Sequence, residues 1–288
     1  MQALYDLPAP AKLNLFLHIT GRRADGYHLL QSVFMLIDWQ DRLNVELRAD
    51  GQISREDLTT PLPADDLTVR AARALQTLTG HTEGVHIGVH KAIPAQAGMG
   101  GGSSDAATCL LALNRLWRLK LPLATLCALG EQLGADVPFF LHGRNAWVEG
   151  IGETITPVAL PPTRCVVVKP VAGLATEAIF SNPALKRDTE PATILGFAAN
   201  PYGFGRNDLQ PVAQSLCPDV GQALQWLHRH GLQGRMTGSG SAVFALLSSP
   251  AWPGNAPDAS ANTPSGWQVR HCSNLDVHPL VGWATSDK

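Results

Sequence analysis

The 288-residue sequence has no apolar run close to the ~20 residues that a membrane-spanning helix requires. Its first residues, 1–8, carry no basic stretch followed by an apolar one, which is the pattern of a secretory signal. The net charge is only −2, and the chain has no block of lysine and arginine. These absences predict a soluble, cytoplasmic protein with neither a membrane nor a nucleic-acid partner.

Cysteine is scarce and irregularly spaced. The five cysteines form no Cys-x-x-Cys pair, and their number is odd. This pattern predicts reduced thiols instead of a disulfide framework or a zinc site. We therefore expect no metal held by the side chains alone. Hydrophobic residues make up 45% of the chain, which is enough for a packed core.

The most informative stretch is the glycine-rich run over residues 94–104. Four glycines fall within 98–102, two serines follow, and an apolar helix-like run covers 106–117. Glycines let backbone N–H groups surround an anion, and a helix N-terminus adds unpaired donors. Because no lysine follows the glycines, the run is not a Walker-type P-loop. It predicts a phosphate cradle, with a flexible Gly/Ser connector as the alternative.

Alternating apolar residues predict a half-buried strand over 11–19, with Lys12 and Asn14 on the same face. The proline-rich segment 160–163 is a credible domain boundary. Before it we expect a turn at 21–26, strands at 32–39, 41–47 and 85–90, helices at 66–78 and 123–133, and a hairpin over 146–157. After it we expect a strand at 165–169, helices at 176–180, 212–216 and 220–229, a polar surface loop over 183–193, a Gly/Ser turn and strand over 234–247, a loop over 250–266 and an edge strand at 268–272.

Four segments occur in an order that resembles the GHMP kinases, a family of small-molecule kinases: 10–14, 94–105, 134–138 and 237–241. The resemblance implies an α+β, two-domain GHMP kinase fold. Its N-terminal domain would be similar to domain 2 of ribosomal protein S5, and its C-terminal domain would be ferredoxin-like. We place the ATP-binding and catalytic domain at 1–159 and the C-terminal domain at 160–288.

Within this family, segment 10–17 together with Gly-Arg-Arg-Ala-Asp-Gly-Tyr-His at 21–28 resembles members that act on a cytidine diphosphate ester. The resemblance implies transfer of the γ-phosphoryl group of ATP, with Mg²⁺, to a small-molecule cytidine diphosphate substrate. The acceptor would be the 2-hydroxyl of its methylerythritol part, within the non-mevalonate isoprenoid pathway. The oligomeric state stays open.

The resemblance implies two catalytic residues, Asp136 and Lys12. Asp136 lies in Gly-Ala-Asp-Val-Pro and would accept the proton of the attacking hydroxyl. Lys12 would keep that carboxylate ionised and offset charge on the transferring group. The structural alternative for Asp136 is that it caps a helix that begins near Val137. The alternative for Lys12 is a solvated lysine on the face of a strand.

The glycine-rich run would bind the triphosphate, and one of its two serines would approach Mg²⁺. Asp105, which follows it, is expected in the first turn of a helix, favoured by the dipole. The predicted nucleotide-binding residues are Pro94, Ala95, Gln96, Ala97, Gly98, Met99, Gly100, Gly101, Gly102, Ser103 and Ser104.

The resemblance also implies a pocket for the cytidine part of the substrate. Tyr27 and Phe180 offer rings on which a pyrimidine can stack, and the His28 imidazole can hydrogen-bond its edge. Asn14 would help hold the substrate, with Thr176 near its diphosphate. A core Phe180 and a surface His28 are the plain alternatives.

Two rival functions remain open on the sequence. Another kinase of the family, for homoserine or mevalonate, would not need a cytosine pocket at 26–28. A catalytically silent nucleotide-binding protein would not need both Lys12 and Asp136. A Gly238-Ser-Gly240 turn is expected to close the site from the second domain, with an ordinary hairpin as its alternative.

Overall fold

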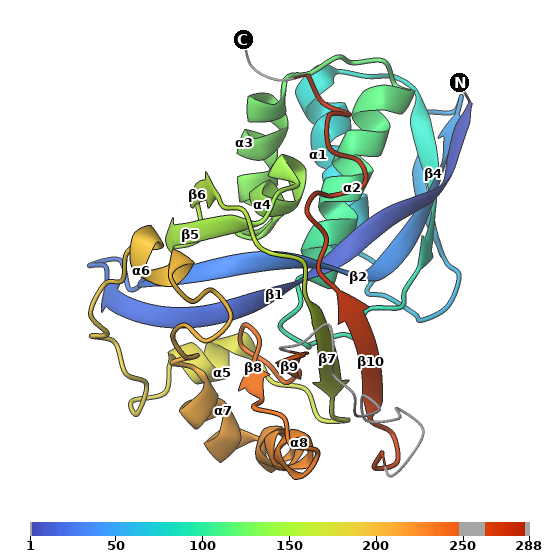
Figure 1. Cartoon of the computed structure of the whole chain (residues 1–288). Coiled ribbons are helices and arrows are strands. Elements are labelled where there is room, and N and C mark those ends of the chain that lie inside the picture. Colours follow the sequence, from blue (N-terminus) through green and yellow to red (C-terminus); the bar gives the residue numbers. More distant parts are fainter. Residues whose placement is uncertain (1, 248–262, 286–288) are drawn as a thin grey trace.

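The computed structural model describes residues 2–247 and 263–285, and its strands form two separate sheets (Figure 1). The first sheet follows the order β3-β4-β2-β5-β6, with β1 paired along β2. All its strand pairs are antiparallel except β3 with β4. Its strands are β1 (Ala3–Arg22), β2 (His28–Arg48), β3 (Ile53–Asp57), β4 (Gly84–His90), β5 (Ala146–Gly150) and β6 (Thr154–Pro157).

The long strands β1 and β2 form a hairpin around the predicted turn. The residues predicted as strands at 32–39 and 41–47 both lie in β2, but β2 is one continuous strand, so the division into two was wrong. Pro10 pairs with Gln40 and Ala11 with Ile37, so a bulge in β2 occupies the expected break. A further register shift follows Asn14. Bulges re-aim side chains and occur often beside active sites.

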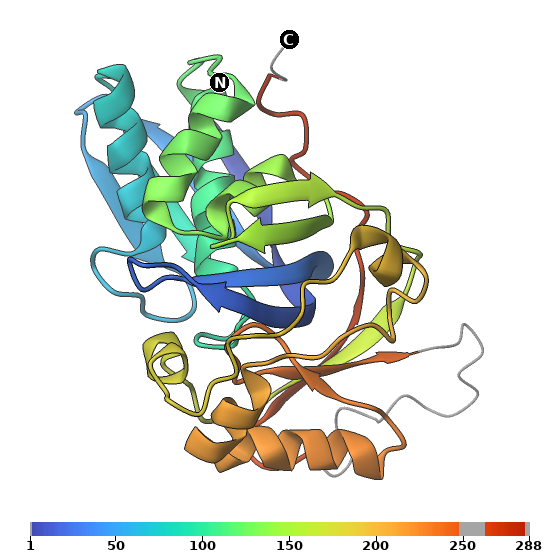
Figure 2. The same cartoon turned by 90° about the vertical axis from the view of Figure 1, so that its left-hand side faces the viewer.

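Four helices cover one face of the first sheet (Figures 1 and 2). They are α1 (Leu67–Thr79), α2 (Gly101–Leu116), α3 (Leu123–Leu133) and α4 (Val137–His142). α1 begins where the Asp66 side chain accepts the Val69 N–H and ends at Gly80 in the left-handed conformation. α2 packs against the other three helices and against β1 and β2. It begins five residues before the apolar run that predicted it.

The second sheet has the order β10-β7-β9-β8 and is antiparallel throughout. Numbered along the chain this is 4-1-3-2, the order of a ferredoxin-like sheet, as predicted. Its strands are β7 (Arg164–Lys169), β8 (Arg235–Met236), β9 (Val243–Leu247) and β10 (Gln268–Ser273). The predicted loop over 250–266 lies largely outside the described residues.

Helices α7 (Gln210–Leu216) and α8 (Pro218–Arg229) pack on the outer face of this sheet (Figure 2). They and α5 (Thr176–Phe180) were predicted, whereas α6 (Ile194–Ala198) was not. The polar segment expected as a surface loop at 183–193 has no regular structure, but Leu185 and Thr189 within it are buried.

The inner faces of the two sheets bury a shared aromatic core. The Phe16 ring centroid lies 5.3 Å from that of Trp147 and 5.1 Å from that of Phe204. Residues 9–19 of β1 are therefore buried without a break, and the prediction of a half-buried strand was wrong. The two-domain α+β organisation is confirmed, and the boundary at residues 159 and 160 stays a prediction.

The last described segment, 274–285, returns to the helices of the first sheet. Leu275 N–H donates to the Leu36 carbonyl at 2.8 Å, and Leu280 is buried in that core. The Arg115 guanidinium lies over the Trp283 ring, with its Cζ 4.5 Å from the ring centroid. The C-terminal segment thus joins the two halves of the molecule a second time.

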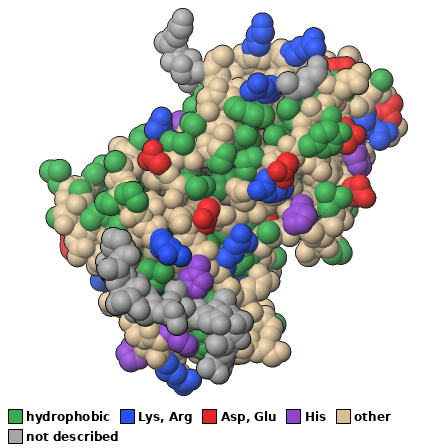
Figure 3. All heavy atoms as spheres, turned by 45° about the vertical axis from the view of Figure 1, so that its right-hand side comes forward, with side chains coloured by type: hydrophobic (Ala, Val, Ile, Leu, Met, Phe, Trp, Pro, Cys, Tyr) green, Lys and Arg blue, Asp and Glu red, His purple; other side chains and the backbone are tan. Residues whose placement is uncertain are grey.

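In the part of the chain that the structure describes, no helix combines the length and apolar character needed to cross a bilayer. Figure 3 shows acidic and basic side chains interspersed over most of one face. This mixture matches the small net charge of −2.

Candidate active site

Lys12 lies at the centre of a polar cluster on β1. Its side chain is only 5% exposed, and its Nζ lies 3.4 Å from Asp136 Oδ2. The same ammonium donates to Asn14 Oδ1 at 2.6 Å and lies 4.3 Å from the centroid of the Phe34 ring. A buried cation is costly unless it is paired and hydrogen-bonded. The solvated-lysine alternative is therefore wrong, and the ammonium is held in one place.

Asn14 continues this network into the core. Its Nδ2 donates to Ser32 Oγ at 2.8 Å, and that hydroxyl donates to the Phe16 carbonyl at 2.5 Å. The amide oxygen is thereby turned toward Lys12, as the shared strand face predicted. Asn14 is nearly fully buried, so its amide is fixed before any ligand binds.

Asp136 precedes α4 but does not cap it. Its backbone is helical, with φ −85° and ψ −12°, and its side chain makes no capping hydrogen bond within residues 2–247 and 263–285. A capping residue would instead have extended backbone. The helix-cap alternative is therefore wrong. The carboxylate faces Lys12 and is 29% exposed, so a ligand can reach it.

The glycine-rich run passes directly beside Lys12. The Lys12 N–H donates to the Met99 carbonyl at 3.0 Å. Gly100 has φ +71°, and a Cβ there would lie 2.9 Å from the Phe140 ring and 3.3 Å from Lys12 Cε. Only glycine fits such a close approach in this conformation. Lys12 and the loop are thus in direct contact.

The N-terminus of α2 lacks a side-chain cap. Gly100 is the N-cap residue, so no side chain there bonds the first N–H groups. Ser104 Oγ is fully buried and finds no hydrogen-bond partner among the described residues. Asp105 is buried as well. Because α2 already begins at Gly101, Asp105 lies beyond its first turn, so the expectation of a dipole-favoured first-turn residue was wrong. Unused donors at a glycine-rich helix start fit an anion such as a phosphate.

The Gly/Ser turn of the second sheet closes against this loop. Thr237 Oγ1 accepts the Asn14 N–H at 2.9 Å and donates to the Gly98 carbonyl at 3.3 Å. Ser241 N–H donates to the Gln96 carbonyl at 3.1 Å. The sequence placed Thr237 within a family motif but indicated no role for it. The hydroxyl links the two domains at the turn that was expected to close the site.

Helix α5 connects this turn to the predicted cytidine residues. At its start, Thr176 Oγ1 and Ser239 Oγ are hydrogen-bonded at 2.7 Å. At its end, the centroid of the Phe180 ring lies 5.1 Å from that of the His28 ring, and the two ring planes make an angle of 36°. Tyr27 is 61% exposed in the β1–β2 turn, and no ring contact joins it to them in the described part of the chain.

A buried charge cluster, which the sequence did not predict, anchors the loop from behind. Lys91 pairs with Asp41 and, at 2.5 Å, with Asp105 of α2. Asp41 also accepts the N–H groups of Ala92 and Ile93, where the loop begins. Burial raises the pKa of Asp105 above its usual range, against the lowering effect of Lys91. Two carboxylates thus share one ammonium and fix the loop to β2 and α2.

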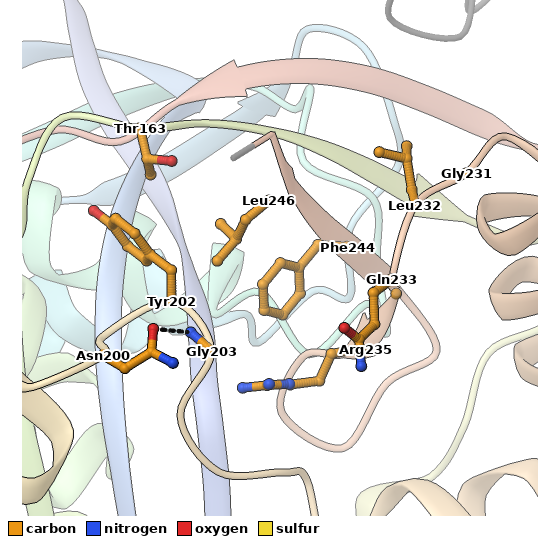
Figure 4. A pocket seen from close by; sticks show the side chains of 11 residues that line it. Thr163, Asn200, Tyr202, Gly203, Gly231, Leu232, Gln233, Arg235, Phe244 and Leu246 are labelled. Carbon is orange, nitrogen blue, oxygen red and sulfur yellow. Dashed lines mark hydrogen bonds between the residues drawn. The ribbon is translucent and has the colours of Figure 1, made fainter. Parts of the chain in front are cut away.

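A separate hollow of about 480 Å³ lies on the inner face of the second sheet. Figure 4 shows Tyr202 and Asn200 on one side of it and Phe244 and Arg235 on the other. It contains no predicted site residue. The Arg235 guanidinium there donates to the Leu15 and Phe204 carbonyls, which is a contact between the two sheets.

Comparison with protein families gives two matches. The family described as GHMP kinases N terminal domain matches residues 66–144, and GHMP kinases C terminal matches residues 184–259. Two curated relatives are both named 4-diphosphocytidyl-2-C-methyl-D-erythritol kinase. That of Albidiferax ferrireducens is 69% identical and covers 100% of this chain and 98% of the relative. That of Variovorax paradoxus is 66% identical, and the match covers 99% of this chain and 100% of the relative.

Solved structures give the same result. A crystal structure of 4-(cytidine 5'-diphospho)-2C-methyl-D-erythritol kinase has a TM-score of 0.76 and 34% identity, covering 93% of this chain and 98% of the other. The mevalonate kinase of Methanococcus jannaschii has a TM-score of 0.69 but only 13% identity, covering 95% and 98%. The second likeness concerns the fold alone.

Proposed function

The chain belongs to the GHMP kinase family, and we propose that it transfers the γ-phosphoryl group of ATP to the 2-hydroxyl of 4-diphosphocytidyl-2-C-methyl-D-erythritol. The observation that carries the proposal is the Asp136 carboxylate, held 3.4 Å from Lys12 beside the glycine loop. The identity of the acceptor is supported by the relatives at 69% and 66% identity. The cytoplasmic location expected from the sequence belongs to the same proposal.

Asp136 is the proposed general base. A hydroxyl that attacks phosphorus must lose its proton, and a carboxylate within hydrogen-bond reach accepts it. The ammonium of Lys12 orients that carboxylate and offsets negative charge on the phosphoryl group as it moves. Asn14 fixes the ammonium through the hydrogen bond at 2.6 Å, so little reorganisation is needed.

The glycine loop and the first turn of α2 are the proposed triphosphate site. The backbone N–H groups there lack side-chain caps, and the Ser104 hydroxyl is a buried polar atom without a partner in the described chain. The N–H groups fit a phosphate, and the hydroxyl fits a phosphate or its cation. When bound, Mg²⁺ would neutralise phosphate charge, and Ser103 or Ser104 would help to hold it.

His28, Phe180 and Tyr27 are the proposed cytidine site, and Thr176 is the residue proposed for the diphosphate. The Phe180 and His28 rings already lie 5.1 Å apart, which supports a shared binding surface. Thr176 and Phe180 stand at opposite ends of α5, about 6 Å apart along the helix axis. This spacing suits a ligand that places a diphosphate at one end and a base at the other.

Phosphorus NMR of the product tests this function. The protein is incubated with ATP, Mg²⁺ and one of three acceptors: the cytidyl substrate, homoserine or mevalonate. We expect a new phosphomonoester resonance with the cytidyl substrate alone, in step with ADP formation. Phosphorylation of homoserine or mevalonate instead would assign a different acceptor. ADP release without any phosphorylated acceptor would reject the kinase function.

A further inference from the structure

We propose that Arg187 is a positioning residue that sets the proton of His28 and holds His28 and Phe180 as one nucleobase-binding unit. The inference rests on the proposed function, because it takes the ligand of these rings to be the cytidine diphosphate ester. The sequence placed Arg187 in a plain surface loop and indicated no role for it.

The Arg187 guanidinium connects the start of β2 with the chain from Phe180 to Leu185. Its Nε donates to His28 Nε2 at 2.9 Å, at the start of β2. Its Nη2 donates to the carbonyls of Phe180 at 3.0 Å and Asn182 at 2.8 Å, at and beyond the end of α5. Its Nη1 donates to the Leu185 carbonyl at 2.9 Å. One rigid, planar group therefore fixes the spacing of the two rings.

The contact also determines which imidazole nitrogen carries the proton. A guanidinium has only donors and stays charged in proteins. His28 Nε2 must therefore accept, so a neutral imidazole carries its proton on Nδ1. One ring nitrogen is taken by Arg187, and the other is left as a fixed donor. A fixed donor suits the edge of a nucleobase that carries hydrogen-bond acceptors. If the His28 ring were protonated on both nitrogens, it would lose the hydrogen bond from Arg187.

The charges around His28 act in the same direction. Burial lowers the pKa of His28, and the positive charges of Arg187 and Arg22 lower it further. Arg22 comes from the end of β1 and Arg187 from the segment after α5. The imidazole is therefore neutral over the range in which an exposed histidine would begin to gain a proton.

Histidine NMR on the ligand-free protein tests the inference, together with steady-state kinetics. Long-range ¹⁵N–¹H spectra report which ring nitrogen is protonated, and His28→Gln identifies the signals of His28. In the wild type we expect the proton on Nδ1. In Arg187→Gln we expect the proton to spread over both nitrogens and the pKa of His28 to rise toward 6.5, its ordinary value.

The kinetic expectation separates positioning from mere support of the fold. Losing one hydrogen bond to a charged group corresponds to about tenfold in affinity. Arg187→Gln should raise KM for the cytidyl substrate by about that factor, while kcat and KM for ATP stay within about twofold. Arg187→Lys keeps the positive charge but loses the planar set of N–H donors. KM for the cytidyl substrate should therefore rise, while the pKa of His28 stays lower than in Arg187→Gln.

Lys186→Gln is the matched control, because it removes one positive charge from the adjacent, exposed position. It should leave KM and the His28 proton unchanged. Equal rises in both KM values, or a His28 proton that stays on Nδ1 in Arg187→Gln, would overturn the inference. If the wild type does not phosphorylate the cytidyl substrate, the proposed function fails, and the NMR result alone decides the role of Arg187.

Discussion

Lys12 contacts more of the candidate active site than its neighbours on β1 suggest. Its ammonium is buried, yet it meets an amide oxygen, a carboxylate and an aromatic face. Those contacts come from β1, the start of α4 and β2, which lie far apart in the sequence. The sequence could pair Lys12 with Asn14 through strand alternation. Its pairing with Asp136 followed only from resemblance to known kinases, because no local pattern joins residues 124 positions apart.

Ser104 offers a test in which stability and activity change in opposite directions. Its buried hydroxyl has no partner among the described residues, so Ser104→Ala should leave the free energy of unfolding unchanged or raise it by up to ~1 kcal/mol. If the hydroxyl serves the bound nucleotide, kcat/KM for ATP should fall by about tenfold. Urea denaturation and ATP kinetics measure the two quantities.

Ser103→Ala is the comparison variant for Ser104, since Ser103 is partly exposed at the same helix start. A clear loss of stability in Ser104→Ala, with kinetics unchanged, would make the hydroxyl a structural group and remove it from the site.

At the scale of elements, the sequence predicted what periodicity and capping determine. Helices α1, α3, α5 and α8 lie where apolar spacing and flanking residues placed them. What it missed depends on packing between distant segments. The break expected near Gln40 is a bulge, because β1 pairs along all of β2. The Lys91 cluster, buried beside Asp41 and Asp105, joins three elements and has no sequence pattern of its own.

Gly98 tests the contact between the glycine loop and the second domain. It has φ +71°, and a Cβ there would lie 2.2 Å from the Thr237 carbonyl oxygen. Gly98→Ala therefore combines backbone strain with a backbone clash. We expect a loss of at least ~2 kcal/mol in the free energy of unfolding and a marked fall in turnover, measured by urea denaturation and phosphoryl transfer.

Gly231→Ala separates the two effects. Gly231 has φ +74°, but an added Cβ would meet nothing within 4 Å among the described residues. This variant should show only the strain of a left-handed alanine, ~1 kcal/mol, with normal turnover. If the two variants behaved alike, the close approach of the turn to the loop would not matter.

For the whole molecule, the C-terminal segment is as informative as the two sheets. The sequence suggested one boundary near residue 160, but residues 274–285 return to the first set of helices. His278 fixes this segment in place. Its backbone N–H donates to the Gly143 carbonyl at 2.8 Å, and its Nδ1 accepts the Leu280 N–H at 3.0 Å. Local patterns could not predict this, since it depends on two chain segments more than a hundred residues apart.

The buried His278 side chain should also make the free energy of unfolding depend on pH. Burial lowers its pKa from 6.5 to about 4. Between those values the unfolded chain binds a proton that the folded chain excludes, so the free energy of unfolding falls as pH drops from 6.5 to 4. A shift of this size corresponds to ~3 kcal/mol, lost in full below pH 4. Urea titrations at pH 7, 5.5 and 4 measure it.

His278→Asn should remove that part of the pH dependence, while His90→Asn, at an exposed position, should keep it. An unchanged pH dependence in His278→Asn would show that other groups cause the loss.

The role of Asp136 as the base is tested by the single-turnover rate of phosphoryl transfer in Asp136→Asn, with ATP, Mg²⁺ and the cytidyl substrate at saturation. Glu131→Gln, the same change on the exposed face of neighbouring α3, is the control. Loss of a positioned base predicts a fall of at least ~100-fold, with ATP affinity and thermal unfolding unchanged. A rate in Asp136→Asn near that of Glu131→Gln would contradict the assignment of Asp136 as the base.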